Sequence, residues 1–472
     1  MTKLPDDKSL HIVIIGSGSG AFAAAIKAVE RGARVTIIEG GDVIGGTCVN
    51  VGCVPSKILI RGANIAYIQA HHNFAGIPFN TPNIDRKQMV AQQQKMVETL
   101  RHTKYEAIIE SNPDINLMRG MASFKNASTL IVKNNDGSGK EVFADRFLLA
   151  VGARPMIPAI DGLDNTPYWT STEALIAKNI PDHLVILGGS VVALELAQAF
   201  HHLGSKVTVM ARSTLLSKKD PEIGDGLKTA FEGEGINIEL HTVPITIHHD
   251  GNAFTVSTET GDVVCDQLLI ATGRQSNADS LALENAGVEI SNSSNILIDD
   301  HMRTNVKHIY AAGDCTNQPQ YVYVAAAAGT RAAINMTAGD KALDLSTMPA
   351  VVFTDPQVAT VGLDEQQAKN HGLDVESRKL GLENIPRALA NMDTRGFIKL
   401  VAEKDSGQIV GCQVLAKEGG EIIQTAALAI RNHMTIEELA DQLFPYLTMV
   451  EGLKLTAQTF YKDIKELSCC AG

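Results

Sequence analysis

The stretch that decides the fold, residues 11–39, reads HIVIIGSGSGAFAAAIKAVERGARVTIIE. The apolar run at 12–15 predicts a short strand, the glycines after it predict a turn, and residues 21–31 have the spacing of a helix. Gly32 stops this helix, and a second apolar run at 35–38 predicts the next strand. Strand–helix–strand units of this kind build parallel sheets, so the sequence predicts an α/β fold.

The turn after the first strand has the spacing of a dinucleotide site. Gly16 permits a tight turn, Gly18 lets the backbone approach a pyrophosphate, and Ala21 lets the helix pack closely on the strand. Glu39 lies 21 residues beyond Gly18, at the end of the second strand, where a carboxylate can accept hydrogen bonds from a ribose hydroxyl. Because strand, helix and acid are all in register, we interpret this as an FAD site.

A second unit of the same kind lies about 172 residues further along the chain. Residues 184–187 predict its first strand, Gly188 and Gly189 its turn, and residues 207–210 its second strand. Ser190 stands where the middle glycine is usual, which leaves less room for backbone approach. Two such units predict two nucleotide-binding domains in series.

No acidic residue lies at the end of the second strand of this unit. Instead, three cations follow it: Arg212, Lys218 and Lys219. Cations at this place suit the 2′-phosphate of NADP rather than the free hydroxyl of NAD, and the alternative is a solvated basic loop. We interpret the second site as an NADPH site.

Outside these units, helices and strands alternate in longer blocks. Residues 56–112 predict helices packed on the first domain, and 115–151 and 236–272 predict hairpins. After about Pro349 the character changes again, with strands such as 397–401 before a helical tail.

The composition excludes two classes of partner. The chain has 472 residues and a net charge of −12, whereas a nucleic acid or an anionic membrane surface requires clustered Lys and Arg. No stretch approaches the roughly 20 apolar residues of a membrane helix. Residues 1–9 lead into no apolar signal core. We therefore expect a cytoplasmic protein with no nucleic acid and no stable membrane association.

Seven cysteines, an odd number, do not make a disulfide framework in such a chain. Cys48 and Cys53 lie in the string GGTCVNVGCVPSK, residues 45–57. Two thiols five positions apart across Gly52, at the start of a predicted helix, can approach each other, and the helix dipole favours the thiolate. We predict a redox-active pair. Three isolated cysteines are expected to be small buried apolar residues: Cys265, Cys315 and Cys412.

With these motifs, the sequence resembles the pyridine nucleotide–disulfide oxidoreductases over essentially its whole length. Further matching segments are Ala150-Val-Gly-Ala-Arg-Pro155, Ala271-Thr-Gly-Arg274, Tyr310-Ala-Ala-Gly-Asp314 and Phe353-Thr-Asp-Pro356. The resemblance implies a glutathione reductase-like architecture: two Rossmann-like dinucleotide-binding domains and a C-terminal α+β dimerisation domain. The expected division is an FAD-binding domain at 1–155 and 276–348, an NADPH-binding domain at 156–275 and a dimerisation domain at 349–472.

The resemblance also implies roles for single residues. Cys53 would be the thiolate next to the flavin and Cys48 the outward, exchanging thiol. Lys57 and Glu195 would form an ion pair near the reactive flavin nitrogen, whereas the alternative from the sequence alone is two ordinary surface residues. The expected FAD-binding residues are Gly16, Gly18, Ala21, Glu39, Thr47, Lys57 and Asp314, and those for NADPH are Gly188, Arg212 and Lys218.

The C-terminal part departs from the disulfide reductases. Those enzymes end with His-Pro-Thr-x-x-Glu, whose histidine is the acid–base of thiol–disulfide exchange. Here Thr448 and Glu451 keep their places, but the histidine has become Tyr446. A phenol with a pKa near 10 is a poor proton shuttle at neutral pH, which argues against organic disulfides as substrates.

The last residues contain the vicinal pair Cys469-Cys470. Two adjacent thiols suit a soft metal ion, because thiolates prefer soft acceptors. Three alternatives stay open. They are a prenylation box, for which Gly472 is an unusual last residue, a paired-thiol redox tail as in large thioredoxin reductases, and an inert terminus.

Tyrosine in place of the histidine, together with the Cys-Cys pair, resembles the mercuric reductases within this family. That resemblance implies FAD- and NADPH-dependent reduction of Hg(II) to Hg(0) for mercury detoxification, by a homodimer whose active site is shared between subunits. Cys469 and Cys470 of one chain would take Hg(II) from small-thiol carriers and pass it to Cys48 and Cys53 of the other. The expected catalytic residues are Cys48, Cys53, Lys57, Glu195, Tyr105, Tyr446, Cys469 and Cys470, and the four cysteines among them are the expected metal ligands.

Many mercuric reductases carry an extra N-terminal metal-binding domain. This chain begins directly at the FAD strand, so we expect a short form or a catalytic core. Two other functions stay open: an NADPH-dependent disulfide reductase with an unusual acid–base, and a thiol metal-binding flavoprotein without turnover.

Overall fold

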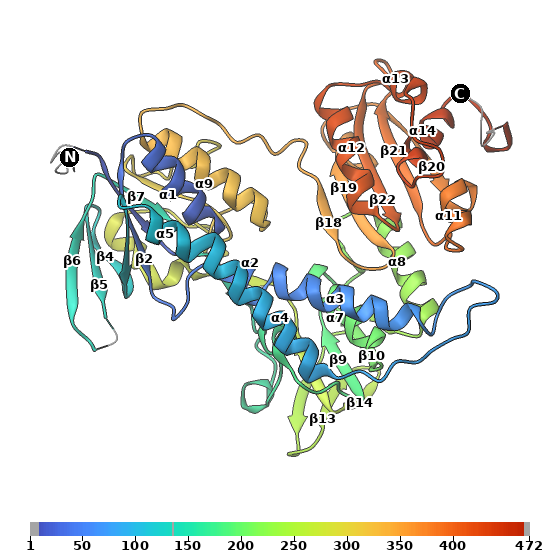
Figure 1. The fold of residues 1–472 in the computed structure, drawn as a ribbon, viewed down its shortest axis with the longest axis horizontal. Coiled ribbons are helices and arrows are strands. Elements are labelled where there is room, and N and C mark those ends of the chain that lie inside the picture. The colour runs from blue at the N-terminus through green and yellow to red at the C-terminus, as the bar shows by residue number, and fades with distance from the viewer. Residues whose placement is uncertain (1–8, 135, 467–472) are drawn as a thin grey trace. The chain divides into compact units, whose positions relative to one another are not determined.

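A computed structural model describes residues 9–134 and 136–466, and these residues form two compact units (Figure 1). The first unit contains the described parts of 9–58, 88–156 and 273–344, and the second those of 59–87, 157–272 and 345–466. Each unit is therefore built from segments far apart in the sequence. Of the helices within the described ranges, none combines the length and the apolar character that a membrane span requires.

A five-stranded parallel sheet, in the order β17-β7-β1-β2-β3, is the centre of the first unit. Its strands β1 (His11–Ile15) and β2 (Arg34–Glu39) are joined by α1 (Ser19–Glu30), which confirms the unit predicted from residues 11–39. Helix α9 (Val322–Met336) packs beside α1 (Figure 1). The two helices approach closely at two glycines, since a Cβ on Gly329 would lie 2.0 Å from the carbonyl oxygen of Gly20.

Two smaller sheets complete the first unit: the antiparallel sheet β4-β5-β6 and the pair β8 and β16. The core beneath the parallel sheet is apolar, and Phe124 and Phe147 meet in it edge to face, with ring centroids 5.5 Å apart. The remaining elements with residues in this unit are α2 (Gly46–Val51), α3 (Cys53–Ile68), α4 (Arg86–Arg101), η1 (His102–Glu106), α5 (Ala107–Ser111), β3 (Ile115–Arg119), β4 (Met121–Asn126), β5 (Thr129–Lys133), β6 (Gly139–Phe143), β7 (Arg146–Leu149), β8 (Ala153–Pro155), β16 (Arg274–Ser276), η3 (Asn277–Leu281), η4 (Leu283–Ala286) and β17 (Ile309–Ala311).

A four-stranded parallel sheet in the second unit has the order β11-β10-β9-β15. Strand β9 (His183–Leu187), helix α7 (Val191–His202) and strand β10 (Lys206–Ala211) form the second predicted strand–helix–strand unit, which is thus confirmed. Strands β12 (Thr246–His249), β13 (Phe254–Thr258) and β14 (Gly261–Cys265) form a separate three-stranded antiparallel sheet. The other elements of this region are η2 (Leu163–Asn165), α6 (Ser171–Ile176), α8 (Pro221–Glu234), β11 (Asn237–Leu240) and β15 (Gln267–Ile270).

The C-terminal part of the second unit is an antiparallel five-stranded sheet in the order β18-β19-β22-β21-β20, with α12 packed on β19 and β22 (Figure 1). The strands and helices predicted after Pro349 are present, and the antiparallel order of the strands is an observation of the structure. Its elements are β18 (Ala350–Val352), β19 (Gln357–Gly362), α10 (Glu365–Asn370), β20 (Val375–Gly381), η5 (Leu382–Asn384), α11 (Pro386–Ala390), β21 (Phe397–Glu403), β22 (Ile409–Ala416), α12 (Gly419–Arg431), α13 (Ile436–Asp441), α14 (Glu451–Gln458) and η6 (Ile464–Glu466).

Candidate active site

A cavity of about 580 Å³ opens at the carboxyl ends of β1 and β2 in the first unit. Gly16 has φ +100°, and a Cβ there would lie 2.3 Å from the carbonyl oxygen of Ala150, so this turn requires glycine. At Gly18 a Cβ would meet only the Cα of Gly46, at 3.9 Å. The protein therefore leaves the space in front of Gly18 open, at the N-terminus of α1, where backbone amides favour a phosphate.

Glu39, the acid predicted at the end of β2, lines this cavity. The Glu39 carboxylate accepts hydrogen bonds from the Ser17 hydroxyl and, at 2.7 Å, from the Gly41 amide. These contacts hold the carboxylate in one orientation at the strand end. Among the other predicted residues, Thr47 and Asp314 line the cavity, and Ala21 is fully buried under the turn.

Burial raises the pKa of Asp314, and the nearby charge of Arg274 opposes this effect. The two side chains approach to 3.8 Å. A volume of this size lies in the range of ligand sites, roughly 300–1,000 Å³. Open glycine backbone, a helix N-terminus and a fixed carboxylate on one strand end together fit a flavin nucleotide.

The predicted cysteine pair lies on the wall of the same cavity. Cys48 is in α2, and Cys53 is the first residue of α3, where the helix dipole favours a thiolate. The turn between them is tight, because a Cβ on Gly52 would lie 2.9 Å from the carbonyl oxygen of Thr47. Both cysteines are thiols here, not a disulfide.

The two thiols share one hydrogen bond. That bond to Cys53 raises the pKa of Cys48, burial and the charge of Cys53 raise it further, and the charge of Lys57 lowers it. Cys53 can therefore carry the negative charge while Cys48 keeps its proton. This arrangement is that of a dithiol which can ionise on one sulfur and exchange on the other.

Tyr105 lies close enough to the pair for the charges of Cys48 and Cys53 to raise the pKa of its phenol, after the larger effect of burial. Its hydroxyl is 3.4 Å from the Ser19 hydroxyl, and its ring meets that of Phe22 edge to face at 4.9 Å. The residue belongs to η1, a π-helical turn. Sequence reasoning missed Ser19, Phe22 and the π turn.

The predicted ion-pair partners lie in different units: Lys57 in the first and Glu195 in the second. Glu195 is buried on α7 and accepts a hydrogen bond from the Phe353 amide at 2.9 Å. Lys57 donates to the Ser56 hydroxyl at 3.4 Å. Glu195 is therefore no ordinary surface residue, and the ion pair with Lys57 stays a prediction.

The second nucleotide turn repeats the geometry of the first. Gly188 has φ +136°, and a Cβ there would lie 2.3 Å from the carbonyl oxygen of Ala271. Arg212 and Lys218 are exposed after β10, as a phosphate site requires. Lys219 is different: its ammonium donates to the Thr360 hydroxyl at 3.1 Å, and burial lowers its pKa. This contact directs the Lys219 side chain toward Thr360 of β19, and its inclusion among the phosphate-binding cations stays a prediction.

Tyr446 is half exposed, in the loop before α14 of the second unit. The next residue, Leu447, has φ +58°, and its amide donates to the buried Glu451 carboxylate at 3.1 Å. Glu451 thus holds this loop in a conformation that L side chains rarely adopt. Cys469 and Cys470 lie outside the described residues.

The three isolated cysteines are buried, as predicted: Cys265, Cys315 and Cys412. Burial raises the pKa of Cys265 and of Cys315 to about 12, so neither is a thiolate at neutral pH.

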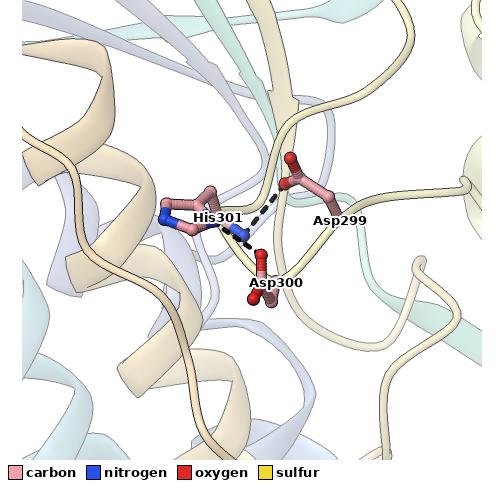
Figure 2. A group of neighbouring side chains, drawn as sticks. All are labelled: Asp299, Asp300 and His301. Carbon is pink, nitrogen blue, oxygen red and sulfur yellow. Dashed lines mark hydrogen bonds and ion pairs between the residues drawn. The ribbon is translucent and has the colours of Figure 1, made fainter.

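A separate group of possible ligands, Asp299, Asp300 and His301, lies on a loop of the first unit (Figure 2). The His301 ring engages Asp300 at 2.6 Å through one nitrogen and Asp340 at 3.2 Å through the other. Asp299 accepts the backbone amides of His301 and Arg303. These contacts join the three side chains in a local hydrogen-bond network.

Comparison with known proteins identifies the family. The sequence profile described as "Pyridine nucleotide-disulphide oxidoreductase" matches residues 10–329, and that of the dimerisation domain matches residues 348–457. The chain belongs to the pyridine nucleotide–disulphide oxidoreductases. Enzymes of this family are flavin- and nicotinamide-dependent oxidoreductases, in agreement with the two nucleotide turns and the cysteine pair.

Within the pyridine nucleotide–disulphide oxidoreductases, the chain is 59% identical to "Mercuric reductase" of Shewanella putrefaciens over 466 residues, which cover 99% of this chain and 84% of that protein. It is 60% identical to "Mercuric reductase" of Shigella flexneri over 470 residues, covering 98% and 83%. Among solved structures, it is similar to the "Cu(II) complex of HOCl-induced flavoprotein disulfide reductase RclA from Escherichia coli". That likeness has a TM-score of 0.86 and 29% identity, and covers 96% of this chain and 100% of the other.

Proposed function

We propose that this protein reduces Hg(II) to Hg(0) with electrons from NADPH, through FAD and the Cys48–Cys53 pair. The observation that carries the proposal is the position of both thiols on the wall of the dinucleotide cavity. The identity of about 60% to mercuric reductases over nearly the whole chain supports the choice of substrate.

Residues of the first unit would hold the flavin nucleotide: Gly16, Gly18, Ala21, Glu39, Thr47, Lys57 and Asp314. The bound flavin supplies two-electron transfer from the nicotinamide to the ion held by sulfur. Gly188 would receive the pyrophosphate of the nicotinamide nucleotide, and the exposed Arg212 and Lys218 would receive the 2′-phosphate that distinguishes NADPH from NADH. By the resemblance to the family, Glu195 would form an ion pair with Lys57.

The thiols bind and orient the ion. Thiolates are soft ligands and exchange readily on a soft cation, so Cys48 and Cys53 can take Hg(II) from another pair of thiols without an oxidation step. The charge of Lys57 favours the thiolate form of Cys48, which the transfer requires.

The replacement of the usual histidine by Tyr446 agrees with this chemistry. NADPH and Hg(II) give NADP⁺, H⁺ and Hg(0), so no proton has to be carried to a thiol leaving group of an organic disulfide. A half-exposed phenol at this place would be a poor acid–base catalyst but a suitable neighbour of a soft ion, together with Tyr105.

Delivery of the ion would need the second cysteine pair. We propose that Cys469 and Cys470 collect Hg(II) from small thiols and pass it to Cys48 and Cys53 of the other subunit of a homodimer. The match of residues 348–457 to the dimerisation domain supports a homodimer.

The test is NADPH oxidation by the flavin-loaded protein in excess small thiol, with and without Hg(II), with trapping of volatile mercury. We expect NADPH oxidation that depends on Hg(II) and yields one Hg(0) per NADPH. If glutathione disulfide is turned over at a comparable rate, the protein is a disulfide reductase instead. Tight Hg(II) binding without NADPH oxidation would identify a binding protein without turnover.

A further inference from the structure

A row of polar side chains crosses a buried face of the C-terminal sheet in the second unit. Strand pairing places Thr360 of β19 opposite Gln413 of β22, and Gln413 opposite Lys399 of β21, so the three side chains share one face. All three residues are buried. The neighbours of Lys399 on this face, Phe397 and Val401, are buried and apolar. A polar row inside an apolar face costs free energy unless partners satisfy it.

The partners of this row come from residues 212–220, the loop between β10 and α8. The Lys219 ammonium donates to the Thr360 hydroxyl at 3.1 Å. Asp220 caps the N-terminus of α8, and its carboxylate also accepts the Lys399 ammonium at 2.9 Å. The side chains of Lys399 and Asp220 are only 5% and 4% exposed, so salt screens this ion pair little. Helix α8 itself packs against β22 (Figure 1).

The 212–220 loop also lies against the second nucleotide turn. The amide of Leu216 donates to the carbonyl of Gly189 at 2.8 Å. A Cβ on Gly189 would lie 2.9 Å from the Cβ of Ala211, so the turn and the start of the loop are in close contact. Leu216 has φ +48°, which L side chains rarely adopt, and it is buried. The loop is therefore fixed between the nucleotide turn and the C-terminal sheet.

The two cations proposed for the 2′-phosphate belong to this loop. Arg212 is its first residue, and Lys218 directly precedes the anchoring residues Lys219 and Asp220. The side chains of Arg212 and Lys218 are exposed. Ordering a flexible loop on binding would cost affinity, whereas a loop that is already fixed presents its cations without that cost.

We propose that the Asp220–Lys399 ion pair positions the 212–220 loop for selective binding of NADPH over NADH. Asp220 and Lys399 are thus positioning residues. This inference rests on the proposed function, in which Arg212 and Lys218 contact the 2′-phosphate. It places a determinant of nucleotide choice in a sheet that carries none of the predicted nucleotide-binding residues. Burial lowers the pKa of Lys399, but hydrogen bonds with carboxylates outweigh it, so the ammonium keeps its charge at neutral pH.

The experiment compares NADPH with NADH as reductants of the flavin in the loaded protein, without Hg(II). The double variant Asp220→Asn with Lys399→Met removes both charges together. Asparagine keeps the helix cap, and neither charge is left buried without its partner, so this variant should fold. The NADPH concentration for half-maximal flavin reduction is expected to rise about 3- to 10-fold, a part of the effect of a charge-assisted contact. The value for NADH is expected to stay unchanged, because NADH lacks the phosphate.

Two further variants test whether the effect passes through the loop. Lys379→Met is the matched control, because Lys379 lies opposite Lys399 on β20 and contacts Glu222 of α8, beyond the loop. It is expected to leave both half-maximal concentrations unchanged. In a protein that carries Arg212→Met and Lys218→Met, the double variant of the ion pair is expected to add nothing, because no cation is left to position.

A binding measurement needs neither flavin reduction nor mercury. The probes are 2′,5′-ADP, which carries the 2′-phosphate, and 5′-AMP, which lacks it, and calorimetry gives both dissociation constants. The wild-type protein is expected to prefer 2′,5′-ADP. Removal of the Asp220–Lys399 pair is expected to reduce this preference about 3- to 10-fold.

The outcomes separate this inference from the proposed function. If the wild-type protein prefers the 2′-phosphate but does not reduce Hg(II), the mercury reaction fails, and the nucleotide ratios still decide the inference. A preference that is lost with Arg212 and Lys218 but kept without the ion pair overturns the inference alone. Equal rises for NADPH and NADH also overturn it, because they reflect general damage to the domain. A wild-type protein without any preference overturns both the NADPH assignment and the inference.

Discussion

The acidity of the Cys48 thiol is set by neighbours with opposing effects. The hydrogen bond with Cys53, burial and the charge of Cys53 raise its pKa, and the positive charge of Lys57 lowers it. The first proton therefore leaves the pair more easily than the second. A soft cation that binds both sulfurs must displace this second proton, so we expect Lys57 to assist the proposed capture of the metal ion.

A Lys57→Met substitution tests this electrostatic role. Without the ammonium the thiolate of Cys48 is less favoured, so its pKa rises, and alkylation of the 48–53 peptide at pH 8 is expected to slow about 3- to 10-fold. Lys95→Met, on the exposed side of α4, is the control. An alkylation profile unchanged from wild type would show that Lys57 does not act on the pair.

Sequence reasoning was most accurate for residues whose chemistry follows from local geometry. The need for glycine at Gly16 follows from the strand–turn–helix pattern, and the structure confirms it, because a Cβ there would lie 2.3 Å from the Ala150 carbonyl oxygen. The binding of a ribose by Glu39 stays a prediction. The contact of Lys219 with Thr360 could not be predicted, because it joins residues 141 positions apart. The contact of Ser19 with Tyr105 was missed for the same reason, since it spans 86 positions.

At the scale of elements, the contact of α1 with α9 supports the turn proposed to bind the flavin. A Cβ on Gly329 would lie 2.0 Å from the Gly20 carbonyl oxygen, and backbone cannot move aside cheaply. Gly329→Ala is expected to force the helices apart, at a cost of about 1–3 kcal/mol, and to lower Tm by about 3–10 °C. Because α1 begins at the flavin turn, the flavin content of the purified protein should fall as well.

Gly233→Ala is the matched control for this substitution. Gly233 lies in α8, and a Cβ there would meet nothing within 4 Å. Alanine at such a place is expected to stabilise the protein by about 0.5–1 kcal/mol. Equal Tm values for Gly329→Ala and Gly233→Ala would contradict the close helix contact.

Elements with regular hydrophobic spacing were predicted from the sequence, and irregular ones were not. Both strand–helix–strand units and the strand β21 follow from apolar spacing alone. The π turn at His102–Glu106 has no such signal, because its extra residue is held by Arg101, Asn50 and Glu106 rather than by a local pattern. The left-handed conformation of Leu447 depends in the same way on a buried carboxylate four residues away.

At the scale of the whole molecule, a half-buried charge network joins the nucleotide sheet of the second unit to its C-terminal sheet. Arg395 contacts Glu234 at 2.6 Å, Asp393 at 2.9 Å and Asp355 at 3.2 Å. Glu234 also accepts from His202 at 3.0 Å and from Gln198 at 2.9 Å, both on the helix of Glu195. Gln198 binds the amide and the carbonyl of Asp355 at 2.7 Å each. This network fixes the segment that donates to Glu195.

Stability should therefore fall in acid. Burial raises the pKa of Glu234 and of Asp393, but the bonds and charges of His202 and Arg395 outweigh it, so both pKa values are lowered. A carboxyl group whose pKa is lower in the folded protein than in the unfolded chain stabilises the fold above its unfolded-state pKa, near 4. This stabilisation is lost as the pH falls through the folded-state pKa. Arg395→Met is expected to lower the free energy of unfolding by about 2 kcal/mol at pH 7. This loss is smaller than that for a fully buried ion pair, because Arg395 is partly exposed. The substitution should also make the stability depend less on pH in acid. Urea midpoints between pH 3 and 7 measure both effects, and parallel curves for the two proteins would contradict the network.

If the active site is shared between subunits, as we propose, a mixed dimer of two inactive variants should regain activity. One variant lacks the inner pair (Cys48→Ala with Cys53→Ala), and the other lacks the tail pair (Cys469→Ala with Cys470→Ala). Neither homodimer has a complete path for Hg(II). In a mixed dimer, the tail of the first chain meets the inner pair of the second, so one of the two sites is complete and about half of the wild-type activity is expected.

The mixed dimer can be isolated with a different affinity tag on each chain and assayed with Hg(II) in excess small thiol. Activity near half of wild type means that the ion crosses from one subunit to the other. If each tail serves its own subunit, the mixed dimer has no complete path and is no more active than the mean of the two homodimers. The same assay without Hg(II), with flavin reduction by NADPH as the measurement, should give equal rates in all the proteins, because that reaction needs neither cysteine pair.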